Sequence, residues 1–113
     1  MLDAAALAAI LDPERKVPGW WKKDQPNFGP PQPLDTLPWT FTGPPDLHTA
    51  REHAWRLEYW LEKKSYGTVR ALGITQVFKA CGCPENDVLV EENTDHTAAL
   101  VAAIERIANE KSS

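Results

Sequence analysis

Residues 46–64 read DLHTAREHAWRLEYWLEKK, and this stretch decides the fold. Its apolar side chains recur at intervals of three and four residues, a pattern that places them along one face of a helix. The stripe consists of Leu47, Ala50, Ala54, Leu57 and Leu61. Asp46 follows Pro45 and is a favourable N-cap. We therefore predict a helix over residues 46–64 that begins at Asp46 and packs its stripe on a core.

The residues after this helix favour short strands. β-Branched and aromatic residues between glycine breaks predict strands over residues 68–74 and 76–81. One helix over residues 68–80 is the rival interpretation, but Gly73 beside β-branched neighbours weakens a helix interior. Residues 87–91 run apolar after a turn signal and predict a further strand. Strands are the favoured interpretation of the whole stretch 67–92.

The two ends of the chain predict helices. Thr94 offers a hydroxyl N-cap for a helix over residues 94–110, and Asp95 opposes the helix dipole in its first turn. Its expected buried face consists of Leu100, Ala103, Ile104 and Ile107. Asp3 can cap an alanine-rich helix over residues 1–12, which Pro13 ends.

The stretch of residues 13–45 is rich in proline and tryptophan and contains nine of the ten prolines. Proline removes a backbone donor, so neither a long helix nor a central strand fits there. A disordered linker would be poor in aromatic residues, so we predict an irregular segment that wraps a core or binds a partner. The whole chain, 1–113, is then one α+β domain with three helices and a small antiparallel sheet of two to three strands.

Composition excludes several classes of function. A net charge of −4 argues against a general nucleic-acid binder, which would show a basic patch. No stretch approaches the roughly 18 apolar residues of a membrane span, and the apolar N-terminus reads as a helix rather than a signal peptide. Two cysteines one residue apart do not make a secreted disulfide framework, so a cytoplasmic setting in a host cell is expected.

The C-terminal run EENTDHTAALVAAI, residues 91–104, resembles the end of small phage proteins of the alpha-beta-alpha sandwich family. Phe41-Thr42, Asp46-Leu47 and Ala54-Trp55 are similar to that family's entry into its tryptophan-bearing helix. The resemblance covers residues 39–107 in the order of elements. It implies a phage or prophage accessory protein, and it carries over no catalytic residue because the family defines none.

Cys81-Gly82-Cys83 is the sharpest chemical motif. Two thiolates with a histidine could bind zinc, and the candidates are His48, His53 and His96. The favoured alternative is a pair of half-buried thiols at the end of a strand, so no cofactor is expected. The chain also lacks a nucleophile elbow and a phosphate-binding loop, so an enzyme is not expected.

An acidic stretch lies between Lys79 and Arg106, where no lysine or arginine occurs. We predict four of its residues as partner-binding: Glu85, Asp87, Glu91 and Glu92. Such an acidic edge could meet a basic patch on a partner and speed their association. The alternative is a charged edge strand that discourages aggregation.

Trp20 and Trp21, followed by Lys22 and Lys23, are the second set of predicted partner-binding residues, because exposed tryptophans are frequent binding hot spots. The alternative is that this pair covers the protein's own small core. Three other tryptophans are expected to do so: Trp39, Trp55 and Trp60.

These features together predict a small non-enzymatic protein from a phage or other mobile element. It would bind a host or viral protein, and inhibition of a host defence complex is one concrete form. The alternatives are a small zinc-binding or catalytic domain centred on Cys81 and Cys83, and a structural subunit of a phage particle.

Overall fold

The computed structural model describes residues 2–25, 28–79 and 88–112, and within these ranges the chain is α+β, as predicted. Its helices are α1 (Ala4–Leu11), α2 (Ala54–Lys63) and α3 (His96–Ser112). Strands β1 (Trp21–Lys22) and β2 (Thr40–Phe41) form one antiparallel pair. A three-stranded antiparallel sheet contains β3 (Tyr66–Ala71), β4 (Ile74–Lys79) and β5 (Val88–Asn93). Short 3-10 turns, η1 (Leu34–Thr36) and η2 (Arg51–His53), complete the described elements.

Helix α1 begins as its sequence predicts. The Asp3 carboxylate accepts a hydrogen bond of 2.8 Å from the backbone N–H of Ala6, so Asp3 is the N-cap. Leu7 and Ala8 are fully buried and attach the helix to the rest of the core. The helix begins three residues after the start of the predicted range 1–12 and ends one residue before its end.

Helix α2 begins eight residues later than predicted, so the predicted start at Asp46 is wrong. The carbonyl of Asp46 accepts backbone bonds from Thr49 and Ala50, which makes an isolated turn. Ala50 then adopts an extended conformation (φ −81°, ψ 134°), which interrupts the helical path before η2. No side chain caps the start of α2 at His53. The apolar stripe is still buried despite this interruption, because Leu47 is as fully buried as Leu57 and Leu61.

The three-stranded sheet settles the choice between strands and helix for residues 68–80 in favour of strands. β3 and β4 form a hairpin whose two-residue loop, Leu72-Gly73, has positive φ at both positions (55° and 76°), as a type I′ turn requires. The predicted strand 68–74 is therefore corrected, because the chain reverses before residue 74. Cys81 and the predicted turn of residues 84–87 lie outside the described residues.

Helix α3 begins at His96, and Thr94 is not its cap. The Asp95 carboxylate accepts a 3.0 Å bond from the backbone N–H of Ala98 and so takes the role predicted for Thr94. The side chain of Asn93 in turn accepts from the backbone N–H of Asp95. The helix continues to Ser112, two residues past the predicted end.

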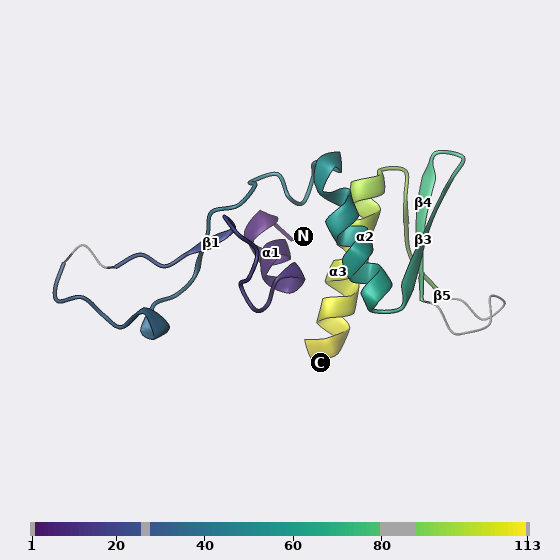
Figure 1. Cartoon of the computed structure of the whole chain (residues 1–113). Helices are drawn as coiled ribbons and strands as arrows, with labels where there is room; N and C mark the ends of the chain where they lie inside the picture. The colour runs from purple at the N-terminus through teal and green to yellow at the C-terminus, as the bar shows by residue number, and fades with distance from the viewer. Residues whose placement is uncertain (1, 26–27, 80–87, 113) are drawn as a thin grey trace.

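The elements are arranged in layers along one axis (Figure 1). Helices α2 and α3 lie side by side and cover one face of the three-stranded sheet, and α1 packs on the side of α2 that faces away from the sheet. The core runs through all of these layers. Its largest fully buried apolar side chains are Leu7, Leu47, Leu57, Leu61, Val77, Leu100 and Ile104.

Beyond α1 the chain projects from this body, at the end opposite the sheet, as an arm of which residues 23–25 and 28–39 are described (Figure 1). The molecule measures 60 × 27 × 22 Å, and its radius of gyration is 16.9 Å. A compact domain of this length would have a radius of gyration of about 13 Å. The arm accounts for this elongation, and strands β1 and β2 hold its two ends together at the body.

Candidate protein-interaction surfaces

The base of the arm, residues 12–22 and 40–43, is organised by a buried carboxylate. Asp12 ends α1, and its side chain accepts hydrogen bonds of 2.9 Å from the backbone N–H groups of Lys16 and Val17. It also accepts a 2.8 Å bond from the indole Nε1–H of Trp21, nine residues away. The side chain of one residue thus fixes both the turn after α1 and the strand that begins the arm.

Hydrogen bonding changes the acidity of Asp12. Burial alone would raise the pKa of this carboxyl, because burial disfavours the charged form. The bonds from Val17, Lys16 and Trp21, together with the positive charge of Arg15, outweigh burial and lower the pKa below its ordinary value. Asp12 is therefore held as a carboxylate that contributes to stability at neutral pH.

Trp20 belongs to the core, so its predicted role as an exposed partner-binding residue is wrong. Its side chain is 6% exposed, and its ring meets that of Phe41 edge-on with the centroids 6.0 Å apart. Gly43 lies against the rings of Trp20 and Phe41, and a Cβ added to it would come within 2.8 Å of atoms of both rings. The Arg56 guanidinium covers the Trp20 ring at 4.8 Å.

The other members of the predicted set lie around this base. Trp21 is half-buried, and its ring packs edge-on against Phe41 at 5.4 Å. Lys22 is exposed and pairs with Asp24 at 3.3 Å. Lys23 lies over the ring of Trp39 at 4.7 Å. Both lysines therefore have a contact within the arm, and whether they or Trp21 also bind a partner stays a prediction.

The arm itself exposes aromatic and apolar surface. Phe28 is 91% exposed and Trp39 is 46% exposed, so Trp39 does not cover the core as predicted. All of the prolines in the run Pro30-Pro31-Gln32-Pro33 are exposed. Gln25 bridges the two sides of the arm, because its side chain both donates to and accepts from the backbone of Gln32 at 2.8 and 2.9 Å.

A second aromatic surface lies on α2, where Trp55 is 58% exposed and Tyr59, one turn later, is 55% exposed. With the half-buried Trp60 they line a groove of about 280 Å³. Cations lie over these rings, Arg56 over Trp55 at 4.5 Å and Lys63 over Tyr59 at 4.7 Å. The prediction that Trp55 covers the core is therefore wrong, and Trp60 covers it in part.

The structure describes only two of the four predicted acidic partner-binding residues, because Glu85 and Asp87 lie outside the described residues. Glu91 and Glu92 lie on β5, and both have intramolecular partners. A Glu91 carboxylate oxygen lies 3.2 Å from Nε of Arg106, and Glu92 accepts a 2.8 Å bond from the side chain of Gln76. Both carboxylates therefore contact other side chains of the same chain. Whether a partner binds this acidic edge stays a prediction.

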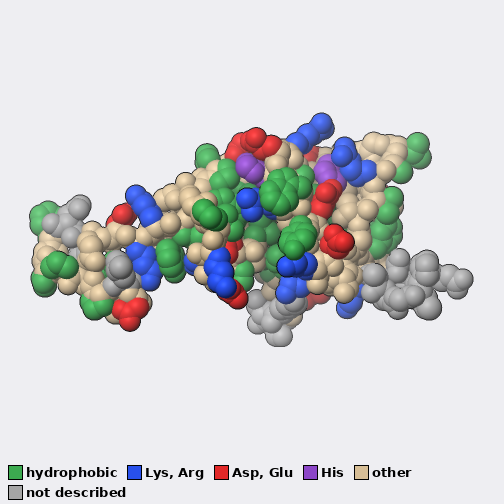
Figure 2. Space-filling view, in the orientation of Figure 1, with side chains coloured by type: hydrophobic (Ala, Val, Ile, Leu, Met, Phe, Trp, Pro, Cys, Tyr) green, Lys and Arg blue, Asp and Glu red, His purple; other side chains and the backbone are tan. Residues whose placement is uncertain are grey.

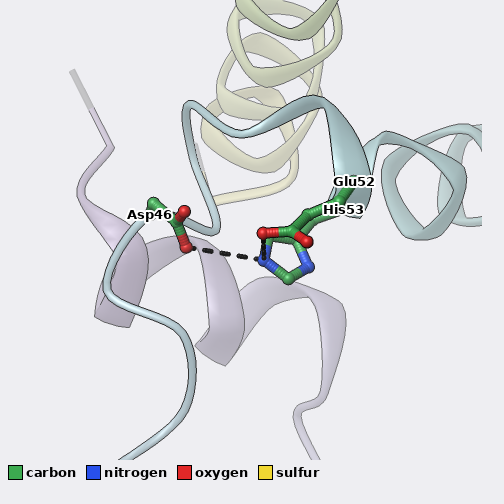
Figure 3. A group of neighbouring side chains, drawn as sticks. All are labelled: Asp46, Glu52 and His53. Atoms are coloured by element: carbon green, nitrogen blue, oxygen red, sulfur yellow. Dashed lines mark ion pairs between the residues drawn. The ribbon is translucent and has the colours of Figure 1, made fainter.

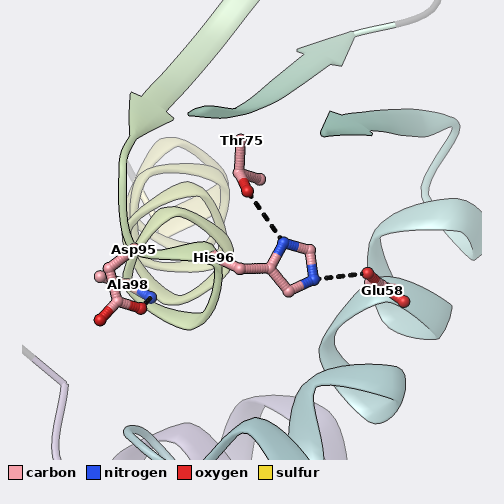
Figure 4. Close-up of polar contacts among 5 residues, drawn as sticks. All are labelled: Glu58, Thr75, Asp95, His96 and Ala98. Carbon is pink, nitrogen blue, oxygen red and sulfur yellow. Dashed lines mark hydrogen bonds and ion pairs between the residues drawn. The ribbon is translucent and has the colours of Figure 1, made fainter. Parts of the chain in front are cut away.

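The three histidines do not converge on one zinc site, and Cys81 and Cys83 lie outside the described residues. His96 begins α3 and is buried, with a different side chain at each ring nitrogen (Figure 4). Its Nδ1 lies 3.0 Å from the hydroxyl of Thr75 on β4, and its Nε2 lies 2.7 Å from a carboxylate oxygen of Glu58 on α2. A neutral ring with its proton on Nε2 satisfies both contacts.

This order of hydroxyl, imidazole and carboxylate is the one that activates nucleophiles in hydrolases. However, Thr75 is 2% exposed, so its hydroxyl is not presented to a substrate. The network instead joins β4, α3 and α2 across the centre of the body. Sequence reasoning missed it, because Glu58, Thr75 and His96 are far apart in the chain and carry no shared motif.

His53 faces two carboxylates at the start of α2 (Figure 3). Its Nε2 lies 3.5 Å from Asp46 and 3.7 Å from Glu52, and all three ligand atoms lie within 4.8 Å of one another. Tetrahedral zinc at ordinary bond lengths would separate its ligand atoms by about 3.4 Å. The spacing therefore suits a divalent cation, but at least half of each carboxylate side chain is exposed, so tight binding is not expected from these three ligands.

Comparison with known proteins adds no relative: no protein-family model matches the chain, nor does any curated protein or solved structure. Among the described residues, no helix combines the length and apolar character needed to cross a membrane.

Proposed function

We propose that the protein is a small non-enzymatic interaction protein that binds a protein partner through its arm, residues 23–39. The observation that carries this proposal is the exposure of Phe28 and Trp39 on a segment that projects from the body. Figure 2 shows apolar side chains at the left end of the molecule, where the arm lies, away from the core. Aromatic side chains exposed in this way are typical anchors of protein interfaces.

The described parts of the arm already contact one another in the free protein, which favours binding. The two bonds between Gln25 and Gln32 and the stacking of Lys23 on Trp39 hold its two sides together. Its prolines restrict the backbone further, because each ring fixes φ. Ordering that is already present in the free protein does not oppose association, so fewer contacts are needed for a given affinity.

The proline run suggests the kind of surface that the arm enters. Pro30-Pro31-Gln32-Pro33 favours an extended polyproline II conformation, which docks in grooves lined by aromatic side chains. Phe28 precedes this run and can fill an adjacent apolar pocket. A partner with an aromatic groove beside such a pocket fits the arm best.

A phage or mobile-element origin, with a host or viral protein as the target, is the broader part of this proposal. It is supported by the resemblance of residues 39–107 to the small phage proteins. Inhibition of a host defence complex is a form that requires no catalytic residue, since occupation of a surface is enough.

The test compares arm variants with a tryptophan variant outside the arm. Phe28→Ser and Trp39→Ser should each weaken binding to a purified partner about 30-fold or more, as expected for a hot spot worth about 2 kcal/mol. Trp55→Ser, which removes a comparably exposed tryptophan from α2, should leave the affinity unchanged. The partner is first found by affinity capture from host cells with the wild-type protein.

Two outcomes would overturn the proposal. Equal affinity of the partner for the wild type and for both arm variants would exclude the arm as the binding element. A solution mass above that of the monomer, lost in the arm variants, would instead make the partner a second copy of this chain and favour the structural-subunit alternative.

A further inference from the structure

The groove on α2 exposes aromatic surface to solvent at a place separate from the arm. Trp55 and Tyr59 line it from α2, and more than half of each residue is exposed. Leu11, the last residue of α1, and Val17, in the turn that follows, line it as well. Its volume of about 280 Å³ lies just below the range of small-molecule pockets, roughly 300–1,000 Å³. A groove of this size suits one or two side chains of a docked protein segment.

Two cations, Arg56 and Lys63, also line this groove, and no Asp or Glu is among the described residues that do so. Each cation is held against an aromatic ring of the groove, 4.5 and 4.7 Å from the ring centre. Neither forms an ion pair with a carboxylate in the described parts of the chain, whereas Lys22 and Arg106 each do. Figure 2 shows apolar and basic side chains side by side over α2. The groove therefore complements a ligand that is both apolar and negatively charged.

The spacing of the two cations indicates the shape of that ligand. Arg56 and Lys63 lie seven residues apart on one helix, so they share a face and are separated by about 10 Å along the axis. An extended chain advances about 3.3 Å per residue, so two carboxylates three positions apart span the same distance. The two residues between those carboxylates then lie over the aromatic rings.

We propose that this groove binds a short extended segment of a partner protein in which two acidic residues, three positions apart, flank apolar side chains. One carboxylate pairs with Arg56 and the other with Lys63, and the apolar side chains pack on Trp55 and Tyr59. Nucleic acid is the other polyanion with apolar faces, and the net charge of −4 disfavours it. The groove shares no residue with the arm, so it is a second binding surface that does not depend on the role of the arm.

The experiment titrates the full-length protein with four acetylated and amidated peptides, followed by the indole N–H signals of its tryptophans. The first, Gly-Glu-Leu-Phe-Glu-Gly, should shift the signals of Trp55 and Trp60 and leave that of Trp39 unchanged. It should bind about tenfold more tightly than Gly-Gln-Leu-Phe-Gln-Gly, because two charge-assisted contacts are lost in the latter. Salt of about 500 mM should remove most of this preference, because it screens exposed charges.

The other two peptides separate spacing from composition. Gly-Leu-Glu-Glu-Phe-Gly has the same residues with its carboxylates adjacent, and it should bind several-fold more weakly than the first peptide. Gly-Glu-Ser-Gly-Glu-Gly keeps the carboxylate spacing without the apolar side chains, and it should show no saturable binding. Together they test whether the groove recognises an apolar segment between two charges.

Two tryptophan variants test where the first peptide binds. Trp55→Ser removes aromatic surface from the groove and should weaken binding at least tenfold. Trp39→Ser, a matched control on the arm with a comparably exposed ring, should bind the peptide as the wild type does. The expected result is the reverse of that for the partner of the arm, so the two proposals can fail separately.

Two charge variants test the role of the cations. Lys63→Glu reverses one charge of the groove and should weaken binding of the first peptide about tenfold or more. Arg70→Glu on the exposed part of β3 changes the net charge by the same amount and should change the affinity less than about twofold. Circular dichroism verifies that each variant is folded.

The proposal is overturned if the Glu and Gln peptides bind equally, or if folded Trp55→Ser or Lys63→Glu binds the first peptide as the wild type does. Tighter binding of an oligothymidylate than of this peptide would also overturn it, because the groove would then be a nucleic-acid site. A dimer that dissociates in Trp55→Ser and persists in Trp39→Ser would contradict it as well, since a second copy of the chain would then occupy the groove.

Discussion

The arm and its base are built from the same kinds of residues but differ in burial. Both contain prolines and tryptophans from one continuous stretch of the sequence. In the base, Trp20 is buried, whereas in the arm Phe28 and Trp39 are exposed. The base has a buried carboxylate, Asp12, that reaches its backbone, and the arm has no anchor of this kind to the body among its described residues. A few specific contacts therefore decide which aromatic residues become core.

The largest expected effect is on the free energy of unfolding, and it should differ between the tryptophan of the base and the tryptophan of the arm. Trp20→Ala should lower the free energy of unfolding by about 3–5 kcal/mol, because it leaves a cavity next to Phe41. Trp39→Ala should cost less than about 1 kcal/mol, because that ring is half in solvent. Urea denaturation followed by far-ultraviolet circular dichroism measures both variants. Similar losses would mean that the arm packs on the body in solution.

Asp12 should show the next largest effect, and its effect should depend on pH. Asp12→Asn weakens three charge-assisted hydrogen bonds and should cost about 2 kcal/mol at pH 7. The folded-state pKa of Asp12 lies below its ordinary value of 3.8, so its stabilisation is fully present above that value. It is lost as the pH falls through the folded-state pKa.

The measurement is urea denaturation of the wild type and Asp12→Asn between pH 7 and pH 2. The difference in the free energy of unfolding should shrink below about pH 4 as the wild-type carboxylate takes up a proton. Asp35→Asn on the exposed arm is the control and should match the wild type at pH 7. A difference for Asp12→Asn that stays constant across the range would exclude the carboxylate as the anchor.

Gly43 offers a smaller test of how tightly the base is packed. Gly43→Ala places a Cβ within 2.8 Å of the rings of Trp20 and Phe41, and it should cost about 1–3 kcal/mol through overpacking. Gly67→Ala on β3 is a matched control, because a Cβ there meets no atom within 4 Å. Thermal unfolding of the two variants compares them directly. Equal melting temperatures would show that the rings can shift to admit the methyl group.

Much of the body follows from local sequence patterns. The capping carboxylate of Asp3 and the apolar stripe from Leu47 to Leu61 correctly indicated helices with one buried face, although Leu47 lies before α2. Glycine breaks correctly indicated strands rather than a helix, but not the position of the turn between them. The exact starts of α2 and α3 were missed. Several polar residues near each start can accept the first backbone N–H groups, and the surrounding chain selects among them: Asp95 rather than Thr94 at α3, and no side chain at α2.

The candidate interaction surfaces were harder to predict, because exposure of a tryptophan is not a local property. Trp55 and Trp20 both have apolar and basic neighbours in sequence. Trp20 is buried because Phe41, twenty-one positions later, returns beside it, and Trp55 is exposed because it lies on the flank of its helix. The proline-rich composition did direct attention to the segment that contains the arm, although the residues within it that we now propose to bind a partner are Phe28 and Trp39.

The sequence by itself determined the α+β class, the buried stripe of α2 and the presence of strands after it, because backbone preferences and apolar periodicity act over a few residues. Tertiary structure alone decided that residues 23–39 leave the body, that Asp12 holds the base of the arm, and that α2 and the end of α1 line one aromatic groove. These features depend on groups brought together from distant parts of the chain. Their energies come from burial and hydrogen bonding across those contacts, which no local pattern records.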